Sequence, residues 1–99
     1  MSRLDRAAII ASLGERIGAV PDPEQQADLT ASRGKIAVVA APGEIDAALG
    51  RLKPLPGYRW IAINGADLFM VSPKTIGSKV GIMDATGKVL KAADLPRPK

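Results

Sequence analysis

Apolar residues recur at four-residue spacing near the start of the chain, which predicts an amphipathic helix within residues 1–20. Asp5 or Ser2 can cap its first turn. Gly18 is expected to end it, because glycine tolerates the left-handed conformation that closes many helices. The repeating apolar positions are Ile9, Leu13 and Ile17.

Residues 21–34 are mainly polar and begin with Pro21 and Pro23, two residues that interrupt regular structure. This composition favours a polar connection. A short helix over residues 23–29 is the alternative that the same residues leave open.

The β-branched run at residues 35–40 predicts a strand that is buried on both faces. Pro42 suits a first helical position, and the acidic residues that follow it suit a first turn, so we expect a short helix ending near Gly50. Pro54 and Pro56 restart an extended chain. Strand, helix and strand then form a βαβ-like unit, which is right-handed if its strands are parallel.

Asn64 and Gly65 separate two apolar runs, residues 58–63 and 66–71. Asn-Gly between such runs is a strong signal for a β-hairpin, because both central residues of a type I′ turn need a positive φ. A two-residue loop would place all the aromatic residues of the chain on one face and aliphatic residues on the other. Both faces would then need a cover. The aromatic residues are Tyr58, Trp60 and Phe69.

A turn is expected at residues 72–75, and a second hairpin is predicted where residues 79–83 and 88–91 flank the segment from Asp84 to Gly87. Asp at the first position and Gly at the fourth suit a type I turn closed by a bulge.

The pattern therefore predicts an α+β fold in one domain, residues 1–99: an N-terminal helix, a β-α-β-β core with the Asn-Gly hairpin, and a C-terminal β-hairpin. Within it, residues 1–20 are the helix, 21–34 the polar connection, 35–92 the core and 93–99 a loose tail.

The composition excludes several kinds of catalytic and metal-binding site. The chain has no His and no Cys, which excludes the usual zinc sites, thiol and imidazole catalysis, and disulfides. The acidic residues are scattered, without the spacing of a paired acid and base. Hydroxyl and lysine residues at 72–79 fit turns better than a nucleophile pair. We therefore predict a non-enzymatic protein with no catalytic residue, no cofactor and no metal site.

The net charge of +4 is unevenly placed, with nine basic and three acidic residues in residues 51–99. This half could attract an acidic partner, nucleic acid included, although a mildly basic surface also serves solubility alone. No apolar run approaches the roughly 20 residues of a membrane span, and the first residues make a poor secretory signal. The expected location is the cytoplasm, or the periplasm if an export signal has been removed.

The aromatic residues and their basic neighbour are the candidate binding residues. They could pack as ordinary core, stack against nucleic-acid bases, or contact a second subunit that covers an apolar face. We expect a small protein-interaction module that self-associates, as a homodimer, with a small basic nucleic-acid-binding protein as the alternative. The candidate residues are Tyr58, Arg59, Trp60 and Phe69.

The segment from Leu55 to Trp60, followed by Asn64-Gly65 and Val71, resembles the closing β-hairpin of small periplasmic proteins of the RcnB type. That family is linked to nickel and cobalt homeostasis. The resemblance covers residues 55–71 and consists mainly of turn and strand residues. Because this chain has no His, the resemblance supplies no metal-binding residue.

Overall fold

The computed structural model describes residues 3–95, which form an α+β domain with an N-terminal helix. Its helices are α1 (Arg6–Ile17), α2 (Ile45–Leu52) and α3 (Leu68–Thr75), and short 3₁₀ turns η1 (Pro42–Glu44) and η2 (Gly65–Asp67) lead into α2 and α3. Its strands are β1 (Val20–Pro21), β2 (Leu29–Ala31), β3 (Gly34–Val39), β4 (Arg59–Ile63), β5 (Gly81–Asp84) and β6 (Val89–Lys91).

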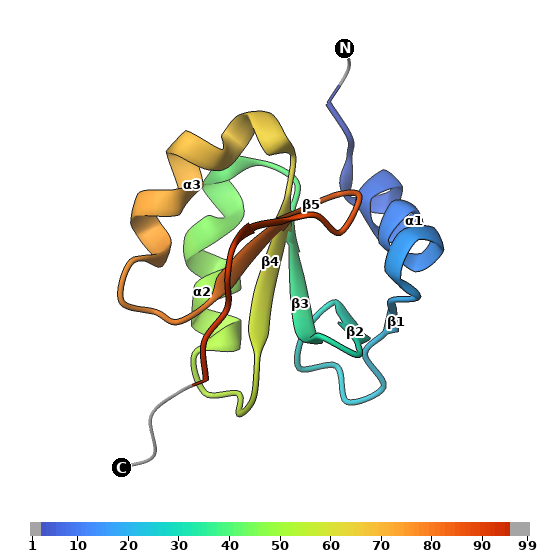
Figure 1. The fold of residues 1–99 in the computed structure, drawn as a ribbon, viewed down its shortest axis with the longest axis horizontal. Coiled ribbons are helices and arrows are strands. Elements are labelled where there is room, and N and C mark those ends of the chain that lie inside the picture. Colours follow the sequence, from blue (N-terminus) through green and yellow to red (C-terminus); the bar gives the residue numbers. More distant parts are fainter. Residues whose placement is uncertain (1–2, 96–99) are drawn as a thin grey trace.

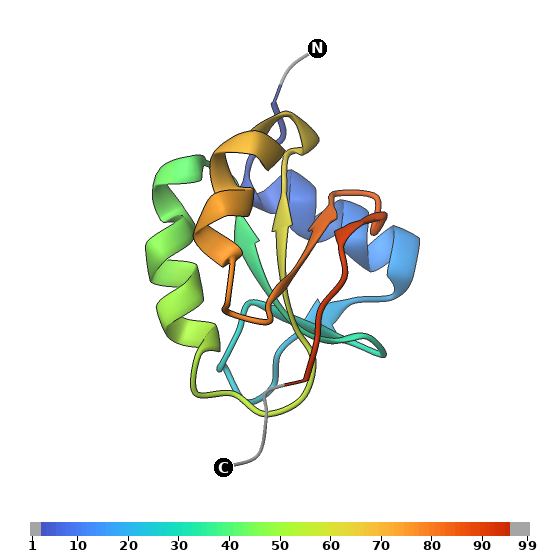
Figure 2. The ribbon, with the colours of Figure 1, turned by 60° about the vertical axis from the view of Figure 1, so that its left-hand side comes forward.

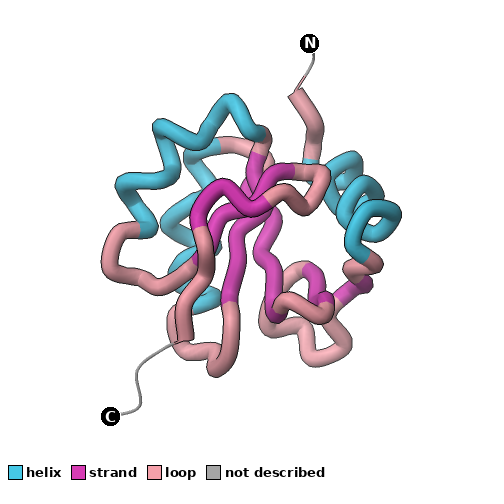
Figure 3. Tube along the Cα trace, in the orientation of Figure 1, coloured by secondary structure: helices cyan, strands magenta, loops and turns pink. Residues whose placement is uncertain are grey.

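The strands form one mixed sheet in the order β1-β2-β3-β4-β5-β6. The three central strands, β3, β4 and β5, run parallel, and the strands on either side of them are antiparallel to their neighbours. Figure 3 shows the central strands in the middle of the molecule, with helices on either side. The predicted strand at residues 35–40 and the helix after Pro42 are confirmed. The two strands of the βαβ-like unit, β3 and β4, are parallel, a point that the sequence left open.

Helices cover both faces of the sheet. Figures 1 and 2 show α2 and α3 on one side and α1 on the other. All five residues of β4 are consequently buried, as expected for a central parallel strand. Ile61 and Ile63 pack towards α2 and α3, whereas Trp60 and Ala62 belong to the cluster under α1. Each sheet face therefore has its cover within this chain.

The N-terminal helix has the predicted caps. The Asp5 side chain accepts a hydrogen bond from the Ala8 N–H at 2.8 Å, and Gly18 adopts the left-handed conformation with φ 69°. Ile9 and Leu13 are fully buried against the sheet. The alternative cap, Ser2, lies outside the described residues, as do residues 96–99 of the predicted tail.

The predicted Asn-Gly hairpin is wrong. Asn64 is extended, with φ −71° and ψ 130°, and Gly65 does not have the positive φ that a type I′ turn requires. The chain instead turns through η2 into α3, and β4 pairs with β3 and β5 in parallel.

The physical reason is that residues 66–75 can form an amphipathic helix. Ala, Leu and Met favour a helix, and Val71 and Thr75 lie one helical turn apart and are buried together. The turn expected at residues 72–75 is likewise part of α3, which continues through Pro73; a proline this close to the helix end removes a single internal hydrogen bond.

The segment at residues 21–34 and the C-terminal hairpin form the two outer parts of the sheet. The polar segment at 21–34 contains β2, which pairs antiparallel with β3, and no helix forms at 23–29. The C-terminal hairpin is confirmed: β5 and β6 are antiparallel, with an irregular register, and Gly87 has φ 83° and donates its N–H to the Asp84 carbonyl.

Candidate functional site

Trp60 belongs to the core. It is 7% exposed, its indole Nε1–H donates to the Arg33 carbonyl at 3.0 Å, and its ring lies against Gly81. A Cβ at Gly81 would come within 2.6 Å of the Trp60 ring, so this indole uses space that only glycine leaves free. Its ring is not a surface on which a base could stack.

Arg59 is also buried, on the opposite side of β4. Its Nη1 donates to the carbonyls of Leu52 and Lys53, both at 3.3 Å, and its Nη2 donates to the Ser78 carbonyl at 2.9 Å. The first two carbonyls lie at the end of α2, where helical carbonyls lack internal donors. Arg59 therefore joins the end of α2 to the connection between α3 and β5.

Tyr58 and Phe69 remain at the surface but on separate elements. Tyr58 precedes β4, and Phe69 lies in the first turn of α3 with 89% of its surface exposed. The predicted aromatic face does not exist, because it depended on the hairpin. Of the candidate residues, the structure leaves Phe69 as the most exposed side chain.

The outer side of α3 carries a cluster of exposed apolar residues, of which only Phe69 was a candidate from the sequence. Met70 is 64% exposed and Ile76, which follows the helix, is 77% exposed. Pro73 lies at i+4 from Phe69 and i+3 from Met70, so it shares the outer side of α3 with both residues. We call this cluster the α3 surface; its residues are Phe69, Met70, Pro73 and Ile76.

A polar cluster closes the carboxyl edge of the central strands. Asp67 forms a two-point ion pair with Arg3, at 2.6 and 2.7 Å, which lowers the pKa of the Asp67 carboxyl. Arg3 also donates to the Ala40 carbonyl at 2.9 Å, and Asn64 holds the main chain of Leu4. A cavity of about 400 Å³ lies beside these residues, but their polar groups are already used in fixing the N-terminal segment.

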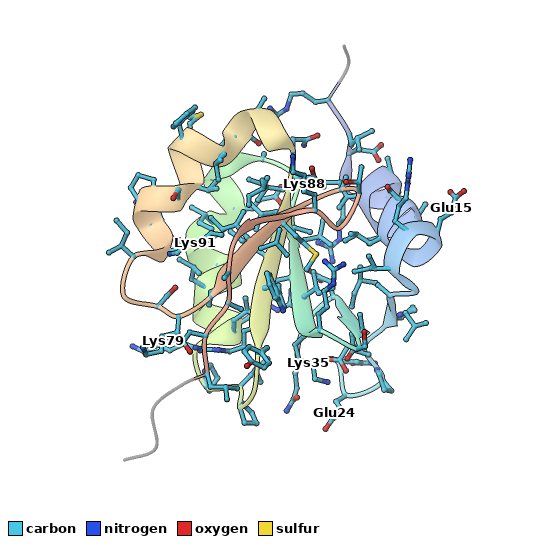
Figure 4. All side chains as sticks on the ribbon, in the orientation of Figure 1. Glu15, Glu24, Lys35, Lys79, Lys88 and Lys91 are labelled. Atoms are coloured by element: carbon cyan, nitrogen blue, oxygen red, sulfur yellow. The ribbon has the colours of Figure 1, made fainter. Side chains whose placement is uncertain are left out.

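Two further carboxylates have structural partners. Asp22 accepts hydrogen bonds from Lys35 Nζ and from three N–H groups of its own loop, and these lower the pKa of Asp22 to about 2. Burial alone would raise the pKa of Asp28, but hydrogen bonds from Arg6, the Val38 N–H and Arg51 leave it lowered. Lys35 also pairs with Glu24, and Figure 4 shows these two side chains next to each other.

A second cavity, of about 410 Å³, lies between the end of α2 and the connection from α3 to β5. Leu49, Ile76 and Val80 give it an apolar wall, and Lys53 and Arg59 give it positive charge. Arg59 and its hydrogen-bond partner Ser78 both line this cavity, which borders the α3 surface at Ile76.

Comparisons with protein-family models, curated proteins and solved structures found no match to this chain. Within residues 3–95, no helix is long and apolar enough to cross a membrane, and no group of three acidic side chains is placed to hold a metal ion. The surface and cavities of this chain are therefore the basis for a functional proposal.

Proposed function

We propose that this protein is a non-enzymatic interaction domain that self-associates through the α3 surface. The observation that carries the proposal is the exposure of Phe69 and Met70 on α3 and of Ile76 directly after it. Large apolar side chains exposed singly are common, but a contiguous group of them is typical of a contact surface. Burial of this group against a partner would remove it from water, which is favourable.

The charges beside the α3 surface fit a second copy of the chain. Lys74 is on α3 and Asp46 is on α2, and their side-chain Nζ and Oδ1 atoms are 3.9 Å apart and well exposed. In a two-fold dimer the same surface meets itself, so each copy must offer both partners of every charged contact. Lys74 of one copy can then pair with Asp46 of the other.

The sheet edges are less suitable for self-association. β1 has two residues and includes Pro21, which cannot donate a main-chain hydrogen bond. β6 has three residues, with Lys88 before it and Lys91 at its end. Short edges with proline or lysine are typical of strands that avoid pairing with another chain.

The non-enzymatic part of the proposal draws on three carboxylates that already have partners. Asp22, Asp28 and Asp67 are each held by cations and donors that have a structural role. A general base needs a carboxylate that is free to accept a proton from substrate. These carboxylates instead fix loops and the N-terminal segment.

The test is the mass of the protein in solution, measured by sedimentation equilibrium from micromolar to high concentration. We expect the wild-type chain to form a dimer and Phe69→Glu to stay monomeric with an unchanged circular dichroism spectrum. Val20→Glu is the matched control, because Val20 is 53% exposed on β1, the edge strand opposite β6; this variant should dimerise like wild type. A wild-type chain that remains monomeric throughout would contradict the proposal.

A further inference from the structure

The cavity beside Arg59 has the size and lining of a small-ligand site. Its volume of about 410 Å³ is within the usual range for such sites, roughly 300–1,000 Å³. Apolar side chains from α2 and from the segment before β5 form part of the wall, and two cationic side chains form another part. The apolar residues are Leu49, Ile76 and Val80.

Among residues 3–95, Arg59 has no ion-pair partner. No carboxylate in that range forms an ion pair with Lys53 either. Only 4% of the surface of Arg59 is exposed. Three carbonyls accept hydrogen bonds from its Nη atoms, whereas its buried Nε has no hydrogen-bond partner in the described part of the chain. A buried guanidinium is more favourable when an anion balances its charge.

Gly50 gives a second, independent observation. It lies inside α2, where glycine weakens a helix relative to alanine. No neighbouring side chain requires the glycine, since a Cβ at this position would meet no atom within 4 Å. Gly50 lines the cavity, so the absence of a side chain here keeps that space open.

We propose that this cavity binds a small organic carboxylate with an apolar body. The apolar body lies against Leu49, Ile76 and Val80, and the carboxylate contacts Lys53, an exposed residue that lines the cavity. Arg59 contributes its positive charge to the site without contacting the carboxylate, because its Nε is buried. This proposal goes beyond self-association and shares one residue, Ile76, with the α3 surface.

Titration calorimetry on the full chain tests the proposal with hexanoate, its neutral analogue hexanamide and inorganic phosphate as probes. We expect hexanoate to bind at one site per chain and hexanamide to bind about tenfold more weakly, because the charge-assisted contact is lost. Equal binding of hexanoate and hexanamide, or no binding of hexanoate at millimolar concentration, would overturn the proposal. Phosphate binding as tight as hexanoate binding would also overturn it, by showing an anion site without an apolar part.

Variants locate the site. Gly50→Leu should abolish hexanoate binding and leave the thermal unfolding temperature equal or higher, whereas Lys53→Gln should weaken binding about tenfold without unfolding the chain. Undiminished binding in Gly50→Leu would show that hexanoate binds elsewhere and would reject the site. The same titration on Phe69→Glu separates the two proposals, since a monomer that still binds hexanoate keeps this site whatever its oligomeric state.

Discussion

The side chain of Asn64 holds the main chain of Leu4 by two hydrogen bonds. Asn64 Oδ1 accepts from the Leu4 N–H at 2.9 Å, and Nδ2 donates to the Leu4 carbonyl at 3.0 Å. A further bond from Nδ2 to the Ala40 carbonyl, at 3.1 Å, connects the ends of β3 and β4. The residue that the sequence suggests as a hairpin turn therefore fastens the N-terminal segment to the sheet.

Loss of the Asn64 amide should leave several main-chain groups without partners. We expect Asn64→Ala to lower the free energy of unfolding by about 1–3 kcal/mol, the usual cost of unsatisfied buried polar groups. Urea denaturation measures this change. A change below about 0.5 kcal/mol, the usual size of a surface substitution, would show that the contact with Leu4 contributes little.

Gly65 distinguishes the observed turn from the predicted hairpin. A type I′ turn would make Gly65→Ala costly, whereas the observed backbone has no positive φ at Gly65 and a Cβ there would meet no atom within 4 Å. We expect a change in unfolding free energy within about 0.5 kcal/mol. Gly87→Ala is the comparison: Gly87 has φ 83° and a Cβ would collide with the Ile17 side chain, so this variant should lose more than about 1 kcal/mol.

Trp60 should behave as a core residue. Trp60→Ala removes a buried indole and its hydrogen bond to the Arg33 carbonyl, and we expect a loss of about 3–5 kcal/mol in unfolding free energy. Tyr58→Ala, at a half-exposed neighbour, should cost far less. Similar losses for the two variants in thermal or urea denaturation would contradict the assignment of Trp60 to the core.

The alternation of side chains in β4 could be read from the sequence, but its partners could not. Trp60 and Ala62 share one face and Ile61 and Ile63 the other, as a strand pattern requires. The error began after Ile63, where Asn-Gly favours a hairpin locally while burial of both strand faces favours a helical crossover. Tertiary packing decides between the hairpin and the helical crossover, and a short stretch of sequence carries no information about that packing.

The same error explains why the candidate site was only partly predicted. Without α3, Phe69 falls on a strand beside Trp60, and Met70 on the opposite face; with α3, Phe69 and Met70 are exposed neighbours. Burial of Arg59 was also not predictable, because its main-chain acceptors, at the end of α2 and at Ser78, are brought to it only by the fold. Caps and turns with local signals, such as Asp5 and Gly18, were predicted correctly.

Asp22 should make stability depend on pH. Its pKa falls from 3.8 to about 2 in the folded protein, mainly through the hydrogen bond from Lys35. A lowered folded pKa gives stability that is complete above the unfolded pKa and is lost as the pH falls through the folded one. We expect the difference in unfolding free energy between wild type and Asp22→Asn to be constant near neutral pH and to shrink between about pH 4 and pH 2. A difference independent of pH would show that Lys35 does not favour the charged form of Asp22.

Self-association through the α3 surface is tested most directly by a dilution series followed by amide chemical shifts. Sedimentation reports only mass, whereas the shifts report which residues leave an interface as the dimer dissociates. We expect concentration-dependent shifts to concentrate at residues 69–76, with residues of β1 and β2 unchanged, and to disappear in Phe69→Glu. Shifts that do not change with concentration, or that concentrate on β6 instead of α3, would contradict the account.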